Sequence, residues 1–296
     1  DPSKRYLGKN PPVPQATIDG ILNEMGINPK VPLVERTWTW IVGIFTRGSL
    51  NKDFSGIEVT HQIAMKASIS LRLLIVGALL AAVLGVFLGV WGAVRQYKVS
   101  DQVVTYASYV LISTPTFVSG VLLMIVATWL NVNVFHNQVI RFSGQYTPGI
   151  TGFWPQLGDA AMHLLLPTIA LMLLQAASYS RYQRSIMLDV LGSDYIRTAR
   201  AKGATRNHAL IKHGVRVALI PMSTYFAYTF GTLMAGATFL ELVFSWKGMG
   251  QYAIDSVRQG DINGTAGSVA FAAILVLISS MLAEVLYAAL DPRVRV

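Results

Sequence analysis

The fold is decided by an apolar stretch at residues 71–94, which reads LRLLIVGALLAAVLGVFLGVWGAV. Its only charged residue is Arg72. Crossing the hydrocarbon core of a bilayer takes roughly 20 apolar residues, and this stretch is long enough. Backbone amides in lipid have no water to bond, so they must hydrogen-bond within their own segment, as a helix does. The stretch therefore predicts a membrane-spanning helix at about 70–94.

Four more apolar stretches of similar length predict further spans, at about 103–130, 164–188, 217–239 and 266–290. The composition agrees, because 53% of the 296 residues are hydrophobic and only 13% are charged. A soluble domain carries about twice that share of charge. The chain has no cysteine, which excludes disulfides and thiolate metal sites. We therefore expect an all-α polytopic membrane protein with five transmembrane helices in this chain.

The basic residues predict how these spans are oriented, because Lys and Arg concentrate in cytoplasmic loops. Between the second and third spans the only basic residue is Arg141. From the end of the third span to the start of the fourth lie Arg181, Arg184, Arg197, Arg200, Lys202, Arg206, Lys212 and Arg216. The first loop, the third loop and the C-terminus are thus expected in the cytoplasm. This placement also explains the net charge of +9 without nucleic acid, since anionic lipid lies on that side.

The same alternation places residues 1–66 outside the cytoplasm. This segment has no apolar stretch that could carry it across the membrane. The sequence begins at Asp1 without Met, so we expect a first spanning helix before it, and six helices in the natural protein. Short helices are expected at 15–25 and at 34–45, the second near the membrane interface. The predicted domains are this extracytoplasmic segment, 1–66, and a transmembrane domain, 67–296.

The loop after the third span reads DVLGSDYIRTARAKGATRNHALIKHGVRVALIP at residues 189–221. Ser193 or Asp194 can cap a short helix there, and Gly203 can end it. Thr205 can cap a second helix, which leads into a span that opens with Pro221. Charge and spacing alone leave two interpretations open. The loop could rest on anionic headgroups, or it could dock onto a cytoplasmic protein.

The loop resembles the EAA signature of permease subunits of ATP-binding-cassette importers. In that signature an E-A-A triplet precedes a glycine by three intervening residues. The corresponding positions here are Arg197, Thr198, Ala199 and Gly203, and the variant DYIRTARAKG is typical of the oligopeptide/dipeptide (OppB/DppB) branch. Further segments resembling that branch are 113–117 (STPTF), 163–167 (HLLLP), 241–261 (ELVFSWKGMGQYAIDSVRQGD) and 286–295 (LYAALDPRVR).

The resemblance implies a type I importer permease fold in a bacterial inner membrane. It also implies four kinds of partner: a second homologous permease subunit, two cytoplasmic ATPases that bind ATP and Mg, an extracytoplasmic solute-binding protein, and membrane lipid. The 189–216 loop would couple to an ATPase. The implied contact residues are Asp194, Tyr195, Arg197, Thr198, Ala199, Lys202 and Gly203. Peptides are the implied substrate, with nickel chelates, haem or glutathione as alternatives within the family.

Polar side chains inside the spans are candidates for the substrate pathway. Four of them recur at i, i+3, i+4 and i+7 and so share a helix face: Tyr225, Tyr228, Thr229 and Thr232. The other candidates are Gln175, Tyr179 and Ser113. Hydrogen bonding between helices would explain the same pattern equally well. Gly85 and Gly89 form a G-x-x-x-G spacing, which predicts close packing against another helix.

The chain shows no catalytic motif and no G-x-x-x-x-G-K-[ST] phosphate loop, so we expect no enzymatic activity and no cofactor in it. The five histidines are scattered, and no metal site is expected. Two other function classes stay open from the residues alone. A proton-coupled secondary transporter needs an ionisable relay in the membrane, where the predicted spans offer Glu284 and otherwise terminal charges such as Arg72. A membrane scaffold would only recruit a partner through the third loop.

Overall fold

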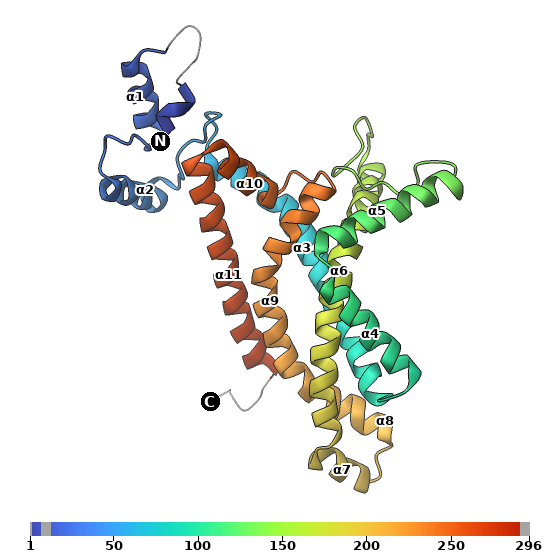
Figure 1. Cartoon of the computed structure of the whole chain (residues 1–296). Coiled ribbons are helices and arrows are strands. Elements are labelled where there is room, and N and C mark those ends of the chain that lie inside the picture. Colours follow the sequence, from blue (N-terminus) through green and yellow to red (C-terminus); the bar gives the residue numbers. More distant parts are fainter. Residues whose placement is uncertain (1, 7–12, 291–296) are drawn as a thin grey trace. The chain divides into compact units, whose positions relative to one another are not determined.

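The computed structural model of the protein describes residues 2–6 and 13–290. Within these ranges every regular element is a helix, apart from one isolated β-bridge between Lys52 and Glu58. The elements (Figure 1) are η1 (Pro2–Tyr6), α1 (Gln15–Glu24), α2 (Leu33–Arg47), α3 (Val59–Val94), α4 (Val99–Ser113), α5 (Thr116–Asn133), α6 (Phe153–Leu191), α7 (Asp194–Ala201), α8 (Arg206–Ala209), η2 (Leu210–Val215), α9 (Arg216–Val243), α10 (Met249–Gln259) and α11 (Ile262–Leu290).

Five helical segments of the described chain are long and apolar enough to cross a membrane. They are α3, α5, α6, Leu210–Met234 and α11. The predicted number of spans is therefore confirmed, and so are the short helices expected near residues 15–25 and 34–45. The end of the 286–295 motif and the C-terminus lie outside the described residues.

The second predicted span is wrong in one respect, because it is not one helix. α4 ends at Ser113 and α5 begins at Thr116, and the chain changes direction sharply between them (Figure 1). Pro115 explains the break. Its ring disfavours helical backbone at the preceding residue, and Thr114 is extended, with φ −93° and ψ 123°. Of the two, only α5 qualifies as a span.

The chain divides into two compact units. One comprises Asp1–Ser70 with Lys247–Ile274, and the other comprises Leu71–Trp246 with Leu275–Val296. α3 and α11 each pass from one unit into the other. The predicted domain boundary at 66/67 stays a prediction.

In the first unit the N-terminal segment is tied to the start of α11. The side-chain amide of Asn263 donates to the carbonyl oxygens of Met25 and Lys52, at 2.8 and 2.9 Å. The Asp261 carboxylate accepts from the backbone N–H of Phe54 at 3.1 Å. These side chains are more than 200 residues from their partners in sequence, so no local pattern predicted the contact. They fix α1 and the following loop on α11.

In the second unit α3 packs closely on α6 through glycines. A Cβ at Gly85 would lie 2.5 Å from the Tyr179 Cβ, and one at Gly89 would lie 2.6 Å from the Ser180 carbonyl oxygen. Real Cβ atoms do not approach so closely, so only glycine fits at both positions. The close packing predicted from the G-x-x-x-G spacing is confirmed, and the helix it meets is α6.

Candidate functional site

α7, in the loop expected to couple to an ATPase, is held by one buried side chain. Ile196 of α7 is 5% exposed and packs in an apolar cluster with Met187 and Val190 of α6 and Leu210 of η2. Gly214 closes this cluster, because a Cβ there would lie 3.2 Å from both Met187 and Val190. α7 is thus attached to the end of α6 along one edge.

The rest of α7 faces away from the protein. The exposed positions among the predicted contact residues are Asp194, Tyr195, Arg197, Thr198, Lys202 and Gly203, whereas Ala199 is half-buried. Arg197 lies 3.7 Å from Asp194, a loose exposed ion pair that contributes little stability. This surface is therefore available to a partner, and its role in coupling stays a prediction.

The turns around α7 follow the sequence pattern with two differences. Gly203 has φ +94°, a conformation that favours glycine, and Thr205 Oγ1 accepts from the His208 N–H at 3.3 Å as a helix cap. Ser193, in contrast, donates its hydroxyl to the Val190 carbonyl at 2.6 Å and does not cap α7. The next span does not open at Pro221, because that residue lies inside α9, after the π-helical η2.

A buried ion pair joins α4 to the α7 end of α6. Arg184 donates to both carboxylate oxygens of Asp101, each at 2.7 Å, and Asp101 is almost fully buried. The Arg184 guanidinium holds the pKa of Asp101 below its ordinary value, against the effect of burial. Gly92 of α3 borders the pair, since a Cβ there would lie 3.0 Å from Asp101 Oδ1. Three helices are thus fixed together next to the loop.

The interface between α6 and α9 consists of aromatic and hydroxyl side chains. The Tyr179 hydroxyl lies 2.7 Å from Thr229 Oγ1. The Tyr225 ring packs edge-on against Tyr179, with centroids 5.7 Å apart, and lies tilted against the Tyr182 ring, with centroids 4.4 Å apart. Gln183 is fully buried in α6, and neither atom of its amide has a hydrogen-bond partner within the described part of the chain.

The pathway candidates lie in different environments in the structure. Tyr179, Tyr225 and Thr229 meet between α6 and α9, as interhelical hydrogen bonding would require. Tyr228 is 68% exposed, and Thr232 is also exposed, with its hydroxyl bonded to the Thr229 carbonyl. The remaining candidates are the half-buried Gln175 and the exposed Ser113 at the end of α4. Contact of any of them with substrate stays a prediction.

Residues 67–296 match the family described as "Binding-protein-dependent transport system inner membrane component". The chain belongs to this family. It is a permease component of an ATP-binding-cassette importer and a multi-pass protein of the inner membrane.

Three curated relatives of the permease are similar along nearly its whole length. The oligopeptide transport system permease protein OppB of Mycobacterium tuberculosis is 44% identical over 296 residues, covering 100% of this chain and 90% of that protein. The oligopeptide permease AppB of Bacillus subtilis is 32% identical, covering 97% and 88%. The dipeptide permease DppB of Escherichia coli K12 is 32% identical, covering 93% and 84%.

The permease also holds a polar cluster at the other end of α6, which the sequence did not predict. Buried Asp159 pairs with Arg141 and accepts from the backbone N–H of Thr147 at 2.6 Å and from its hydroxyl at 2.8 Å. The Thr147 hydroxyl also lies 3.1 Å from His163 Nε2. The i, i+4 spacing of Asp159 and His163 was the available signal. The cluster fastens the segment between α5 and α6 onto α6, beside a cavity of about 400 Å³.

The spanning helices of the permease carry more ionisable groups than the sequence suggested, because α6 and α9 extend beyond the predicted spans. α9 continues to Val243 and buries Glu241, which is 1% exposed, and α6 begins at Phe153 and buries Asp159. Scarcity of charge therefore does not exclude a proton-coupled secondary transporter. Membership of the importer family does.

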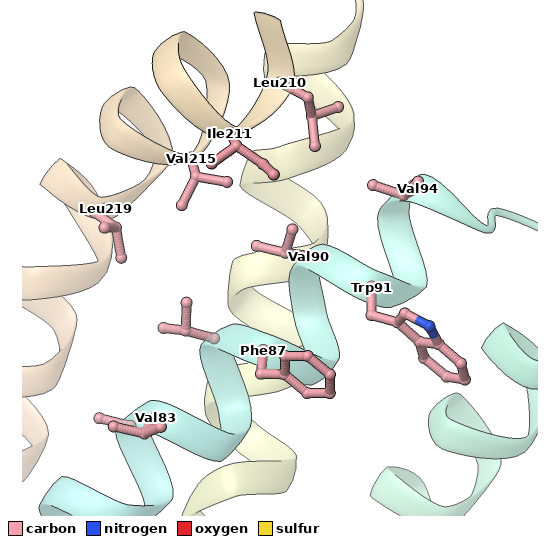
Figure 2. A pocket seen from close by; sticks show the side chains of 11 residues that line it. Val83, Phe87, Val90, Trp91, Val94, Leu210, Ile211, Val215 and Leu219 are labelled. Carbon is pink, nitrogen blue, oxygen red and sulfur yellow. The ribbon is translucent and has the colours of Figure 1, made fainter. Parts of the chain in front are cut away.

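An apolar groove of about 670 Å³ lies beside the predicted coupling loop. Figure 2 shows Phe87 and Val90 of α3 on one side and Ile211 and Val215 of η2 on the other. None of its 11 lining residues is charged. The groove therefore lacks the charged groups that would hold the termini of a peptide, and it is not the candidate substrate site.

Proposed function

We propose that the permease forms half of a pathway for peptides and that α7 and the Gly203 turn dock onto a cytoplasmic ATPase. The names of the relatives support a peptide substrate, since they describe oligopeptide and dipeptide permeases. The basic residues between α6 and α9 support a cytoplasmic location for α7. In this orientation residues 1–66 lie outside the cytoplasm, as the charge pattern of the loops predicts.

The observation that carries the docking proposal is the attachment of α7. One buried residue, Ile196, anchors it, and the remaining surface of basic and hydroxyl side chains is exposed. A helix held along one edge can be covered by a partner without rearranging the protein. Arg184 lies in α6, the helix that leads directly to α7, and pairs with Asp101 of α4, so a displacement of α7 would be passed to α6 and α4 together.

The proposed partners follow from the same assignment. Two ATPases would bind ATP and Mg, because this chain has no phosphate-binding loop. A second permease would complete the pathway, and a binding protein would deliver the solute. ATP binding would then favour one of two global states of the pathway over the other.

Reversing the charge of the docking surface tests the proposal. In the assembled transporter in proteoliposomes, Arg197→Glu is expected to lower ATP-driven peptide uptake at least about tenfold, since like charges facing each other across an interface cost several kcal/mol. Arg258→Glu is the matched control, an exposed charge reversal on α10 that should transport normally. Normal uptake by Arg197→Glu would contradict docking through this surface.

Gly203 allows a second test of the docking surface. No atom lies within 4 Å of a Cβ at this position, so a side chain fits within this chain, although φ +94° strains it. We expect Gly203→Arg to uncouple ATP hydrolysis from uptake. Gly203→Ala carries the same backbone strain without the bulk, and we expect it to retain most of the ATP-driven uptake. Equal loss in both variants would assign the effect to backbone strain and count against a docking partner.

The substrate is tested separately by an uptake assay. Labelled dipeptides and pentapeptides are expected to accumulate in proteoliposomes that hold the complete importer. Accumulation of a nickel chelate, haem or glutathione in place of peptides would contradict the peptide assignment and leave the docking proposal intact.

A further inference from the structure

α2 has one face that is apolar and exposed. Val34, Trp38, Ile41 and Phe45 follow each other at i, i+4, i+7 and i+11, so they line one side of the helix. Their exposed fractions are 82%, 67%, 37% and 85%. No charged residue interrupts this row. Within the described part of the first unit, nothing covers it.

The opposite face of α2 is the one turned toward the protein. Arg36, Trp40, Gly43 and Arg47 repeat the same spacing two residues later, which places them about 200° around the helix. Arg36 donates to the Ile27 carbonyl at 3.2 Å, the Trp40 indole nitrogen is buried, and the Arg47 guanidinium covers Gly43. A helix on a water-soluble surface turns its apolar face inward. α2 does the reverse.

The hydroxyl groups at the borders of the apolar face are satisfied within the helix. Thr37 donates to the Leu33 carbonyl at 2.9 Å, and Thr46 donates to the Val42 carbonyl at 2.7 Å. Polar groups next to an apolar phase need such internal partners, because water is not available to them. Exposed Thr198 of α7 makes the same bond to the Asp194 carbonyl at 2.9 Å, so these bonds permit contact with lipid and do not by themselves indicate it.

From these observations we infer that α2 lies in the lipid–water interface of the membrane, with the Val34–Trp38–Ile41–Phe45 face among the acyl chains. Such helices lie in the membrane plane with the apolar face a few ångströms below the headgroups, and tryptophan is enriched at that depth. Figure 1 shows α2 crosswise to the first turns of α11, which belong to the same unit. Because α11 is a spanning helix, a helix crosswise to it runs along the membrane plane.

The inference goes beyond the proposed function and does not depend on the identity of the solute. It adds an anchor outside the spans. The Asn263 and Asp261 contacts tie the segment that carries α2 to the start of α11, so the lipid would hold the first unit at a fixed depth.

Site-directed spin labelling tests this placement, and the chain offers a clean background because it contains no cysteine. A nitroxide is attached at Phe45→Cys, on the apolar face, or at Thr39→Cys, an exposed matched control on the polar side. The full chain, assembled with its partner subunits, is placed in nanodiscs of phosphatidylethanolamine and phosphatidylglycerol. Oxygen reports lipid exposure of the label, and a water-soluble nickel chelate reports exposure to water.

We expect the ratio of the two accessibilities to reverse, with oxygen favoured at 45 and the nickel chelate favoured at 39. A label at Val34→Cys should behave as at 45, which guards against a local effect of one substitution. Equal access of the nickel chelate to 45 and 39 overturns the inference. A label at 45 shielded from both reagents also overturns it, because a protein would then cover this face.

Discussion

α6 meets α3 and α9 in opposite ways. Against α3 it makes contacts at the backbone, since Gly85 and Gly89 bring α3 within touching distance of Tyr179 Cβ and the Ser180 carbonyl. Against α9 its contacts include long aromatic side chains, among them the Tyr179 and Tyr225 rings. The first interface has one arrangement that fits. In the second interface the side chains can change rotamers without a movement of either backbone.

The difference indicates where a transporter of this kind can move. Packed interfaces switch between discrete arrangements and do not deform continuously. An interface in which glycines lie directly against the neighbouring helix leaves no room for an alternative arrangement, so α3 and α6 should travel together. We expect relative motion between α6 and α9, where aromatic rings and the Tyr179–Thr229 hydroxyl pair can exchange partners. We expect substitutions on the rigid α3–α6 side to cost more stability than those on the adaptable α6–α9 side.

The largest effect on stability is expected at the ion pair between Asp101 and Arg184, which borders α3. Asp101→Ala leaves the Arg184 guanidinium, whose side chain is 25% exposed, without its bidentate partner. Losing one member of a buried pair costs about 3 kcal/mol or more of the free energy of unfolding. Thermal unfolding of the purified complex should show this loss, whereas Asp189→Ala, an exposed acid farther along α6, should change little.

The double variant sharpens this prediction. Adding Arg184→Met to Asp101→Ala removes the unpaired charge, so part of the stability should return. If the stability lost in the double variant equals the sum of the losses in the two single variants, Asp101 and Arg184 are not energetically coupled. The ion pair then does not stabilise the contact between α4 and α6.

A smaller loss is expected from a methyl group inserted between α3 and α6. In Gly89→Ala the new Cβ meets the Ser180 carbonyl at 2.6 Å and the Gln183 Cβ at 2.7 Å, so one helix must shift. Overpacking of this kind costs about 1–3 kcal/mol. Gly158→Ala is the matched control, a glycine of α6 with no atom within 4 Å of the added methyl, and it should not lower the melting temperature. Equal melting temperatures for both variants would show that α3 and α6 can separate freely.

The sequence predicted the number of spans and the small face of α3, because both are local properties. Apolar length identifies a span, and the four-residue spacing of Gly85 and Gly89 identifies a face. The partner of that face was not predictable, since nothing in α3 specifies α6. The bond between Asp101 and Arg184 joins residues 83 positions apart, and their local patterns show only two ordinary charges.

The coupling loop could be predicted from the sequence better than the polar face of α9. Ile196 and Gly203 belong to one short segment, so a motif could locate the loop. The face of Tyr225, Tyr228, Thr229 and Thr232 was predicted as one surface because helical spacing alone was used. The structure divides it, since α6 covers part of it and leaves Tyr228 exposed. Spacing gives the face of a helix, and only packing gives what that face meets.

The smallest effect is expected on the adaptable side, in Tyr179→Phe. The variant loses the 2.7 Å contact with Thr229 Oγ1, which keeps its bonds to the Tyr225 and Phe226 carbonyls. Interhelical bonds of this type contribute about 0.6 kcal/mol, so the melting temperature should barely change. Uptake is the informative measurement. A changed transport rate at unchanged stability would show that this bond distinguishes the states between which α6 and α9 move, as the comparison with α3 requires. A loss of stability as large as in Gly89→Ala would instead indicate that the α3–α6 and α6–α9 interfaces are equally rigid, and would contradict the difference proposed between them.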